Sequence, residues 1–202
     1  MKKPDISNDV SALNFWQALE QSLHLGWLVD PRSEFEPELD VEAFEHYART
    51  ANGRVHMAVP GRMIFFPSTE VLPNDAAWID TAAPGGGTVR RFSPRFYAGL
   101  LGDLGVSAVV CLGRCDPAAA AAFADRGIAA LDLGLDEGGA ALLHGLDLLL
   151  SLAAAAPGAV AVHSGDGFRW PAYTGRLVAA FLVGRLGFGP GAATAWIRML
   201  CP

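Results

Sequence analysis

Residues 159–175 read AVAVHSGDGFRWPAYTG and gather residue types that could do phosphate chemistry. Small apolar residues lead to His163 and Ser164, a loop with glycines follows, and Thr174 with Gly175 begins a helical pattern. Backbone N–H groups of such a loop, together with the start of the helix, can bind a phosphoryl group. The stretch therefore has the layout of a phosphate loop.

The chain also contains three cysteines, Cys111, Cys115 and Cys201. The first two form a C-x-x-x-C pattern that metal sites can use, but no second pair of Cys or His residues accompanies it along the chain. We therefore expect structural thiols and no metal site. The odd number of cysteines, and an N-terminal stretch too polar for a signal peptide, favour a reducing, cytoplasmic location.

Composition excludes two classes of partner. The formal net charge is -6, and the only clusters of basic residues in the sequence are the pairs Lys2-Lys3 and Arg90-Arg91. Nucleic-acid-binding proteins carry larger basic patches, so we expect no nucleic-acid binding. The longest apolar run, residues 140–162, contains Pro157 and divides into a helix and a strand, so we expect no membrane insertion. The chain also carries no complete dinucleotide fingerprint, and we expect no cofactor.

Alternating strands and helices should position the loop. From Ser93 on, helix-start signals such as Ser93-Pro94 and Asp116-Pro117 alternate with short apolar runs. We predict strands at 106–112, 128–133 and 159–163, with helices at 93–104, 116–127, 140–156, 173–187 and 190–200. Strands separated by helices form a mostly parallel sheet, and its ligands bind beyond the carboxyl ends of the strands. The loops 134–139 and 164–172 should lie there.

The N-terminal part begins with a polar tail, residues 1–10. Ser11 should cap a first helix that stops at Gly26, and Asp40 should cap a second. The periodicity of the second helix predicts a buried face made of Val41, Phe44 and Tyr47.

Two short strands are predicted next, at 55–59 and 62–66, joined by Pro60-Gly61. Residues 67–90 are rich in proline and glycine and predict a long loop with at most one turn near Trp78. The alternating part of the chain, residues 91–202, reads as the main domain, and residues 11–66 as an extension in front of it.

Several stretches of the chain resemble the cell-division-cycle-fourteen dual-specificity phosphatases, and they follow in matching order over residues 11–202. These stretches are LDVEAFEHYARTANGRVHMAVPGRMIFF (39–66), FSPRFYAGLLGDLGVSAVVCLGR (92–114), FADRGIAALDL (123–133), GAVAVHS (158–164) and ATAWIRMLCP (193–202). The resemblance implies an α/β, dual-specificity-phosphatase-like fold with a mostly parallel central sheet flanked by helices. It also implies that the domain is C-terminally truncated and that residues 11–66 are a remnant of the family's N-terminal phosphatase-like domain.

The family motif, H-C-x-x-G-x-x-R-T-G, is altered here. A serine, Ser164, replaces the cysteine, Arg169 lies one position short of the motif arginine, and Tyr173 precedes Thr174 in a longer loop. A serine without a neighbouring base is a far weaker nucleophile than a thiolate. We expect a degenerate phosphate loop at His163, Ser164, Gly165, Asp166, Gly167, Arg169, Tyr173, Thr174 and Gly175.

The general acid of the family is an aspartate in the loop after the strand that ends in Asp132-Leu133. Counting from that strand places Glu137 at this position, beside Asp136, and we favour helix capping as the role of both. The family's water-positioning segment has no counterpart in the chain. We therefore expect no catalytic residue and no enzyme.

Two other interpretations of the loop are disfavoured. A nucleophile elbow needs glycines two positions before and after its serine, where this chain has Val162 and Asp166. Gly165 and Gly167 match a dinucleotide fingerprint only in part, because the third glycine is missing.

The sequence thus predicts a non-catalytic pseudophosphatase that acts as a scaffold for protein partners. Phe168 and Trp170 are its candidate interaction residues, and relatives of the family suggest a microtubule-based assembly such as a cilium, an axoneme or a centrosome. The alternative is a phospho-ligand-binding module that uses loop N–H groups and Arg169. A residual protein phosphatase is the third and least favoured interpretation.

Overall fold

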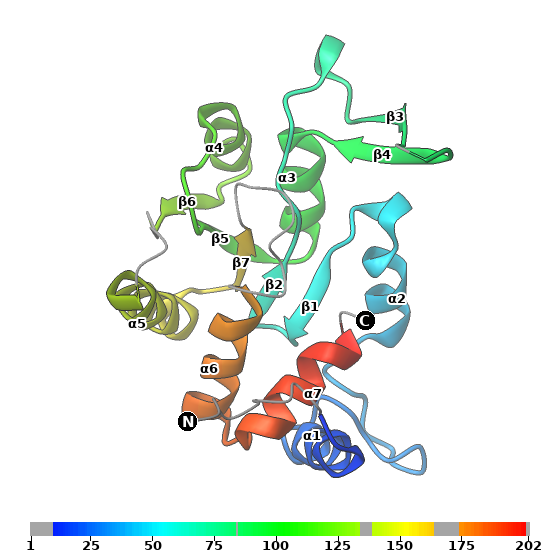
Figure 1. Ribbon diagram of the computed structural model, residues 1–202, viewed down its shortest axis with the longest axis vertical. Coiled ribbons are helices and arrows are strands. Elements are labelled where there is room, and N and C mark those ends of the chain that lie inside the picture. The colour runs from blue at the N-terminus through cyan, green and yellow to red at the C-terminus, as the bar shows by residue number, and fades with distance from the viewer. Residues whose placement is uncertain (1–9, 84, 134–138, 164–173, 201–202) are drawn as a thin grey trace, which may run out of the picture.

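A central sheet of five strands organises the molecule (Figure 1). The computed structural model describes residues 10–83, 85–133, 139–163 and 174–200. The strands lie in the order β1 (His56–Val59), β2 (Met63–Phe65), β7 (Ala159–His163), β5 (Val106–Cys111) and β6 (Ala129–Asp132). β1 pairs with β2 in the antiparallel direction, and the other neighbours are parallel. The expected mostly parallel α/β sheet is confirmed.

Helices cover both faces of this sheet (Figure 1). Their bounds are α1 Ala12–His24, α2 Val41–Ala48, α3 Pro94–Asp103, α4 Pro117–Ala124, α5 Gly139–Ala155, α6 Thr174–Leu186 and α7 Pro190–Leu200. One apolar core packs α3 and α4 against the sheet, and a second core lies between the sheet and α1, α5, α6 and α7. None of the described helices combines the length and the apolar character needed to cross a membrane.

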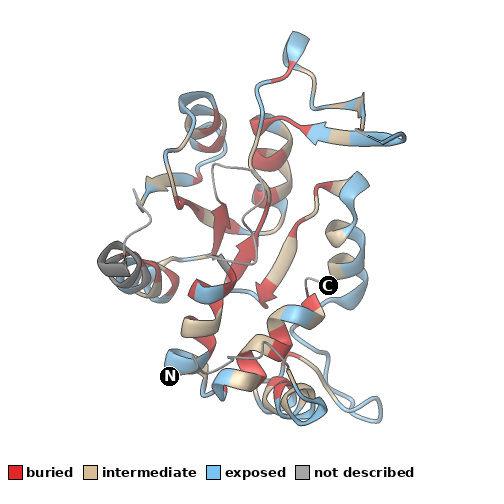
Figure 2. Ribbon diagram, in the orientation of Figure 1, coloured by how far each residue is buried: buried red, intermediate tan, exposed pale blue. Residues whose placement is uncertain are grey.

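Strand alternation divides the buried side chains between the two cores. On β5, Val109 and Cys111 belong to the core under α3 and α4, whereas Val110 belongs to the other core. Neighbouring side chains of a strand point to opposite faces of the sheet, which explains this division. Buried residues follow the central strands along their length (Figure 2).

Capping residues begin the helices at the predicted positions. The Asp116 carboxylate accepts a hydrogen bond from Ala118 N at 2.8 Å, and Ser93 Oγ accepts one from Phe96 N at 3.3 Å. Proline follows each of these caps, where its missing N–H does no harm. These local signals place the starts of α3 and α4, and the start of α4 ends the loop that follows β5.

The structure differs from the sequence prediction within residues 67–90. A short 3-10 turn lies there at η2 (Pro73–Asp75), and an antiparallel hairpin follows, made of β3 (Trp78–Ala82) and β4 (Thr88–Phe92). Another 3-10 turn, η1 (Thr50–Asn52), follows α2. The consecutive glycines at 85–87 are typical of a loop in the sequence. In the structure all three have positive φ and lie in the connection between the two strands of the hairpin. Arg90 stabilises it by donating to Asp80 at 2.8 Å while lying 3.8 Å from the ring centre of Trp78.

The predicted buried face of α2 is wrong in part. No residue of this helix is fully buried, and Val41 is 47% exposed, while Phe44 and Tyr47 are half-buried. Among the described elements the helix packs against the edge strand β1 and the η1 turn, and this arrangement leaves Val41 exposed. The polar tail lies almost wholly outside the described residues, which begin at residue 10.

We predict that Gly158→Ala lowers the free energy of unfolding by about 1 to 3 kcal/mol. A Cβ at this position would overlap the carbonyl oxygen of Gly105, which also accepts a hydrogen bond from Ala159 N at 3.1 Å. Gly102→Ala is the matched control, because its Cβ meets open space within α3 and should stabilise the helix slightly. Urea unfolding measures the free energy of unfolding of both variants. Equal effects of the two changes would contradict the close approach of Gly158 to the carbonyl oxygen of Gly105.

We predict that His56 makes the protein less stable as the pH falls. Burial lowers the pKa of His56, whose Nδ1 lies 3.0 Å from the carbonyl oxygen of Leu200. The folded state therefore resists protonation, while the unfolded chain takes up the proton near its ordinary pKa of about 6.5. The stabilisation is fully present above that pH and is lost progressively as the pH falls below it toward the lowered pKa of the folded state.

His56→Asn keeps a side-chain donor near the Nδ1 position and removes the titrating group. Denaturant unfolding should show that the free energy of unfolding falls more between about pH 7.5 and about pH 5.5 in the unchanged protein than in the variant. An identical loss in both proteins would assign the pH dependence to other groups.

Candidate active site

The site is set by two neighbouring parallel strands that end together. In the register of β5 and β7, Cys111 lies opposite His163, and each is the last residue of its strand. The main chain continues the pairing one step further, because Leu112 N donates to the carbonyl oxygen of His163 at 2.9 Å. The carboxyl ends of parallel strands are where such sheets bind ligands.

Cys111 and His163 are in direct contact. Their Sγ and Nε2 atoms are 3.0 Å apart, Cys111 is fully buried, and His163 is 4% exposed. The ring of Phe66 packs against the imidazole with 5.0 Å between ring centres, which holds the histidine in place. This distance allows a proton to pass between sulfur and nitrogen.

Cys115 joins the pair from the loop between β5 and α4. Its backbone N donates to Asp132 Oδ1 at 2.8 Å, which ties the loop to the end of β6. The next residue, Asp116, caps α4, so Cys115 is fixed on both sides. The ligand atoms of Cys111, Cys115 and His163 all lie within 4.8 Å of one another, and we call these three residues the Cys–His centre.

The surroundings of the Cys–His centre favour neutral thiols. Burial raises the pKa of Cys111 strongly, with further contributions from Cys115 and from the charge of Asp132. Burial also raises the pKa of Cys115, which is half-buried. A thiolate forms here only when a base accepts its proton or a cation compensates its charge.

The structure describes only part of the predicted phosphate loop. His163 ends β7 and belongs to the Cys–His centre, while Thr174 and Gly175 begin α6 as predicted. The remaining predicted residues lie outside the described residues: Ser164, Gly165, Asp166, Gly167, Phe168, Arg169, Trp170 and Tyr173 of the loop, and Asp136 and Glu137 of the general-acid position. Cys111 and Cys115 were expected to be structural thiols, and no local pattern in the sequence connects them with His163.

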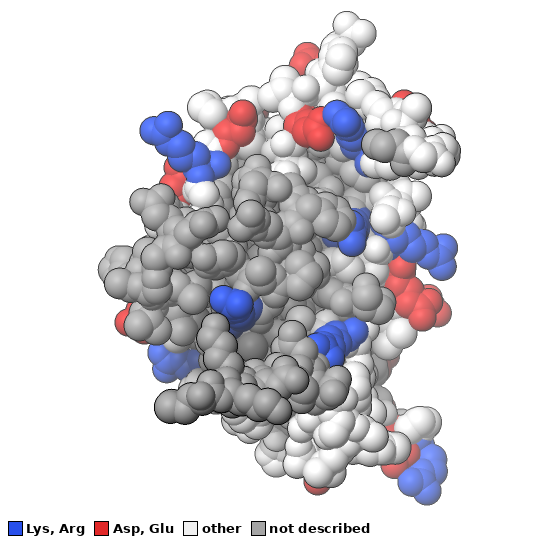
Figure 3. All heavy atoms as spheres, viewed as in Figure 1, with Lys and Arg blue, Asp and Glu red and all other residues white. Residues whose placement is uncertain are grey.

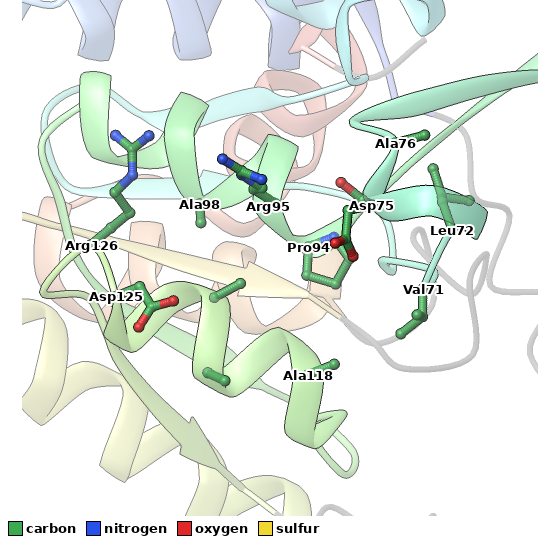
Figure 4. Close-up of a pocket in the computed structure, with 13 residues that line it drawn as sticks. Val71, Leu72, Asp75, Ala76, Pro94, Arg95, Ala98, Ala118, Asp125 and Arg126 are labelled. Carbon is green, nitrogen blue, oxygen red and sulfur yellow. The ribbon is translucent and has the colours of Figure 1, made fainter.

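A separate hollow of about 540 Å³ lies between α3, α4 and the η2 turn (Figure 4). Its described lining includes Pro94, Ala98, Asp125 and Arg126, and no residue of the Cys–His centre. On the face shown in Figure 3, the basic and acidic side chains of the described residues are interspersed rather than gathered into one patch.

Comparisons with known proteins support the resemblance seen in the sequence. The chain is 27% identical over 194 residues to the human dual specificity protein phosphatase CDC14A, which covers 96% of this chain and 29% of that protein. Zebrafish CDC14AB is 26% identical over 194 residues, covering 96% of this chain and 28% of the relative. The chain thus spans less than a third of the length of these relatives. No protein-family model matches it.

Among solved structures, Tk-PTP in its active form matches with a TM-score of 0.48 and 16% identity, over 73% of this chain and 84% of that one.

The expectation of a non-catalytic scaffold, with a phospho-ligand-binding module as its alternative, is wrong. It treated residue 164 as the only place for a nucleophile. In the structure Cys111, from the neighbouring strand, lies 3.0 Å from His163 in a chain similar over nearly its whole length to dual-specificity phosphatases. This contact overturns the expectation that the chain is not an enzyme, because a cysteine and a histidine at this distance can form a catalytic pair.

We predict that a maleimide modifies Cys115 faster than Cys111 in the folded protein. Cys115 is half-buried, whereas Cys111 is fully buried beneath α3 and α4. The measurement uses peptide mass spectrometry on a Cys201→Ser background, with EDTA present to remove metal. Both thiols should react in urea, and modification of Cys111 as fast as Cys115 without urea would contradict the burial.

Proposed function

We propose that this chain, a member of the cell-division-cycle-fourteen family of dual-specificity phosphatases, is a catalytic phosphatase that uses Cys111 as its nucleophile. The contact of 3.0 Å between Cys111 Sγ and His163 Nε2 carries the proposal. A buried thiol needs a base within hydrogen-bond distance to become nucleophilic, and His163 is that base.

The reaction proceeds in two displacements. His163 Nε2 accepts the thiol proton, the Sγ electron pair forms a bond to phosphorus, and the ester P–O bond breaks. The leaving oxygen takes the proton from the imidazolium. Water then attacks the phosphorus of the thiophosphate while His163 accepts a proton, the S–P bond breaks, and the proton returns to sulfur to restore the thiol.

Two helix starts favour the binding of a phosphoryl group near this centre. α4 begins at Pro117 after β5, and α6 begins at Thr174 after β7, so both helices start on the carboxyl side of the sheet. Helix N-termini carry unsatisfied N–H groups and a partial positive charge, which attract phosphate.

Phosphorylated protein side chains are the proposed substrate class. The relatives of the chain are named dual specificity protein phosphatases, and their similarity runs through both strands that carry the Cys–His centre. Burial of the nucleophile favours a low kcat, since the thiol loses its proton against the effect of desolvation. The expected protein partners and cellular compartment stay predictions.

We predict that the chain hydrolyses para-nitrophenyl phosphate and that Cys111→Ala lowers kcat by about 10³-fold or more. Removal of a nucleophile removes the covalent step, whereas Ser164→Ala and Cys201→Ser should leave kcat within a few-fold of the unchanged protein. Circular dichroism establishes that each variant is folded.

A second measurement keeps the assignment testable if Cys111→Ala does not fold. Acid quenching during turnover, followed by peptide mass spectrometry, should find phosphate on Cys111. The proposal would be contradicted if the unchanged protein showed no turnover or if folded Cys111→Ala retained it. Phosphate trapped on a residue other than Cys111 would also contradict it.

A further inference from the structure

We propose that the Cys–His centre is a binding site for a single Zn²⁺ ion, held by the sulfurs of Cys111 and Cys115 and by a ring nitrogen of His163. The sequence predicts no metal site, because the C-x-x-x-C pattern lacks a second pair of ligands along the chain. The fold supplies the missing ligand from β7, 52 residues after Cys111.

The spacing of the three ligand atoms fits zinc. Zinc takes sulfur at about 2.3 Å and imidazole nitrogen at about 2.0 to 2.1 Å in tetrahedral sites, which places ligand atoms about 3.5 to 4 Å apart. All three ligand atoms here lie within 4.8 Å of one another, and Cys111 Sγ is 3.0 Å from His163 Nε2. Small rotations of the side chains bring them to ideal distances.

The ligands are held by structure that exists without the ion. Cys111 and His163 lie on paired strands, and the Phe66 ring packs against the imidazole. Asp132 accepts the hydrogen bond from Cys115 N at 2.8 Å and thereby fixes the loop that carries the third ligand. Such outer partners orient ligands and contribute to metal affinity.

The chemistry of the ligands selects the cation. Two sulfurs with one imidazole form a soft ligand set, which favours Zn²⁺ over Mg²⁺ or Ca²⁺. Binding releases the two thiol protons, and two thiolates then neutralise the double positive charge of the ion. This neutral assembly suits a buried site better than a single thiolate does, because an isolated charge is costly to bury. The carboxylates of Asp116 and Asp132, whose charges act on Cys115, further favour a cation.

An ion can reach the site through Cys115, the half-buried member of the Cys–His centre. Three protein ligands leave the fourth position of a tetrahedral ion for water or another ligand, as in sites where zinc remains accessible. Because the ion takes up the sulfur of Cys111 and the nitrogen of His163, zinc should inhibit turnover reversibly. This inhibition rests on the proposed function, whereas the binding of zinc does not.

The test uses cobalt as a spectroscopic probe in the Cys201→Ser protein after removal of metal with EDTA. Co²⁺ should produce the visible bands of tetrahedral coordination and the near-ultraviolet charge-transfer band of thiolate ligands, at one ion per chain. One equivalent of Zn²⁺ should abolish these bands, and Mg²⁺ should leave them unchanged. Cys115→Ser should lose most of the charge-transfer band, and since Cys115 lies in a loop, this variant should fold.

Asp132→Ala tests the positioning of Cys115, and it should weaken metal affinity by about 10- to 100-fold without removing a ligand. The absence of thiolate bands, or bands that persist unchanged in Cys115→Ser, would overturn the proposed site. Hydrolysis of para-nitrophenyl phosphate is measured on the same samples with and without Zn²⁺. Cobalt bands without turnover would support the metal site and contradict the proposed phosphatase activity. Turnover without cobalt bands would support the phosphatase activity and contradict the metal site.

Discussion

The parallel pairing of β5 with β7 is the constraint on which the rest of the site depends. The register places Cys111 opposite His163, and the alternation of each strand points both side chains to the face under α3 and α4. A shift of one residue in either strand would move one of the two groups to the opposite core. The apolar residues that precede them prevent this shift, because Val109 and Val110, like Ala161 and Val162, belong to opposite cores.

Much of the fold could be predicted from the sequence, because its signals are local. Ser93-Pro94 and Asp116-Pro117 determine where α3 and α4 begin, and short apolar runs determine β5, β6 and β7. The hairpin β3–β4 was not predicted, because a segment rich in proline and glycine is typical of a loop. Three positive-φ glycines are also what a tight connection between strands requires.

The Cys–His centre could not be predicted in the same way. Its residues come from β7, the end of β5 and the following loop, and the order of strands in the sheet decides that β7 lies next to β5. No local pattern carries this order. The family motif has its cysteine at the position of residue 164, so the resemblance predicts a nucleophile there and not at Cys111. The useful signal was that Cys111 and His163 each end a buried apolar strand, since side chains at such positions gather at one edge of a parallel sheet.

Burial connects the two chemistries of the Cys–His centre. Cys111 is fully enclosed, so its thiolate is unfavourable unless a positive group lies beside it. A protonated His163 supplies one positive charge, and the Cys111 thiolate beside it is a nucleophile whose partner can donate a proton to the leaving group. A zinc ion supplies two positive charges, and the second thiolate, that of Cys115, is then needed to make the site neutral. The hydrogen bond from the Cys115 backbone to Asp132 therefore supports the zinc-bound state, because it holds the second sulfur near the first.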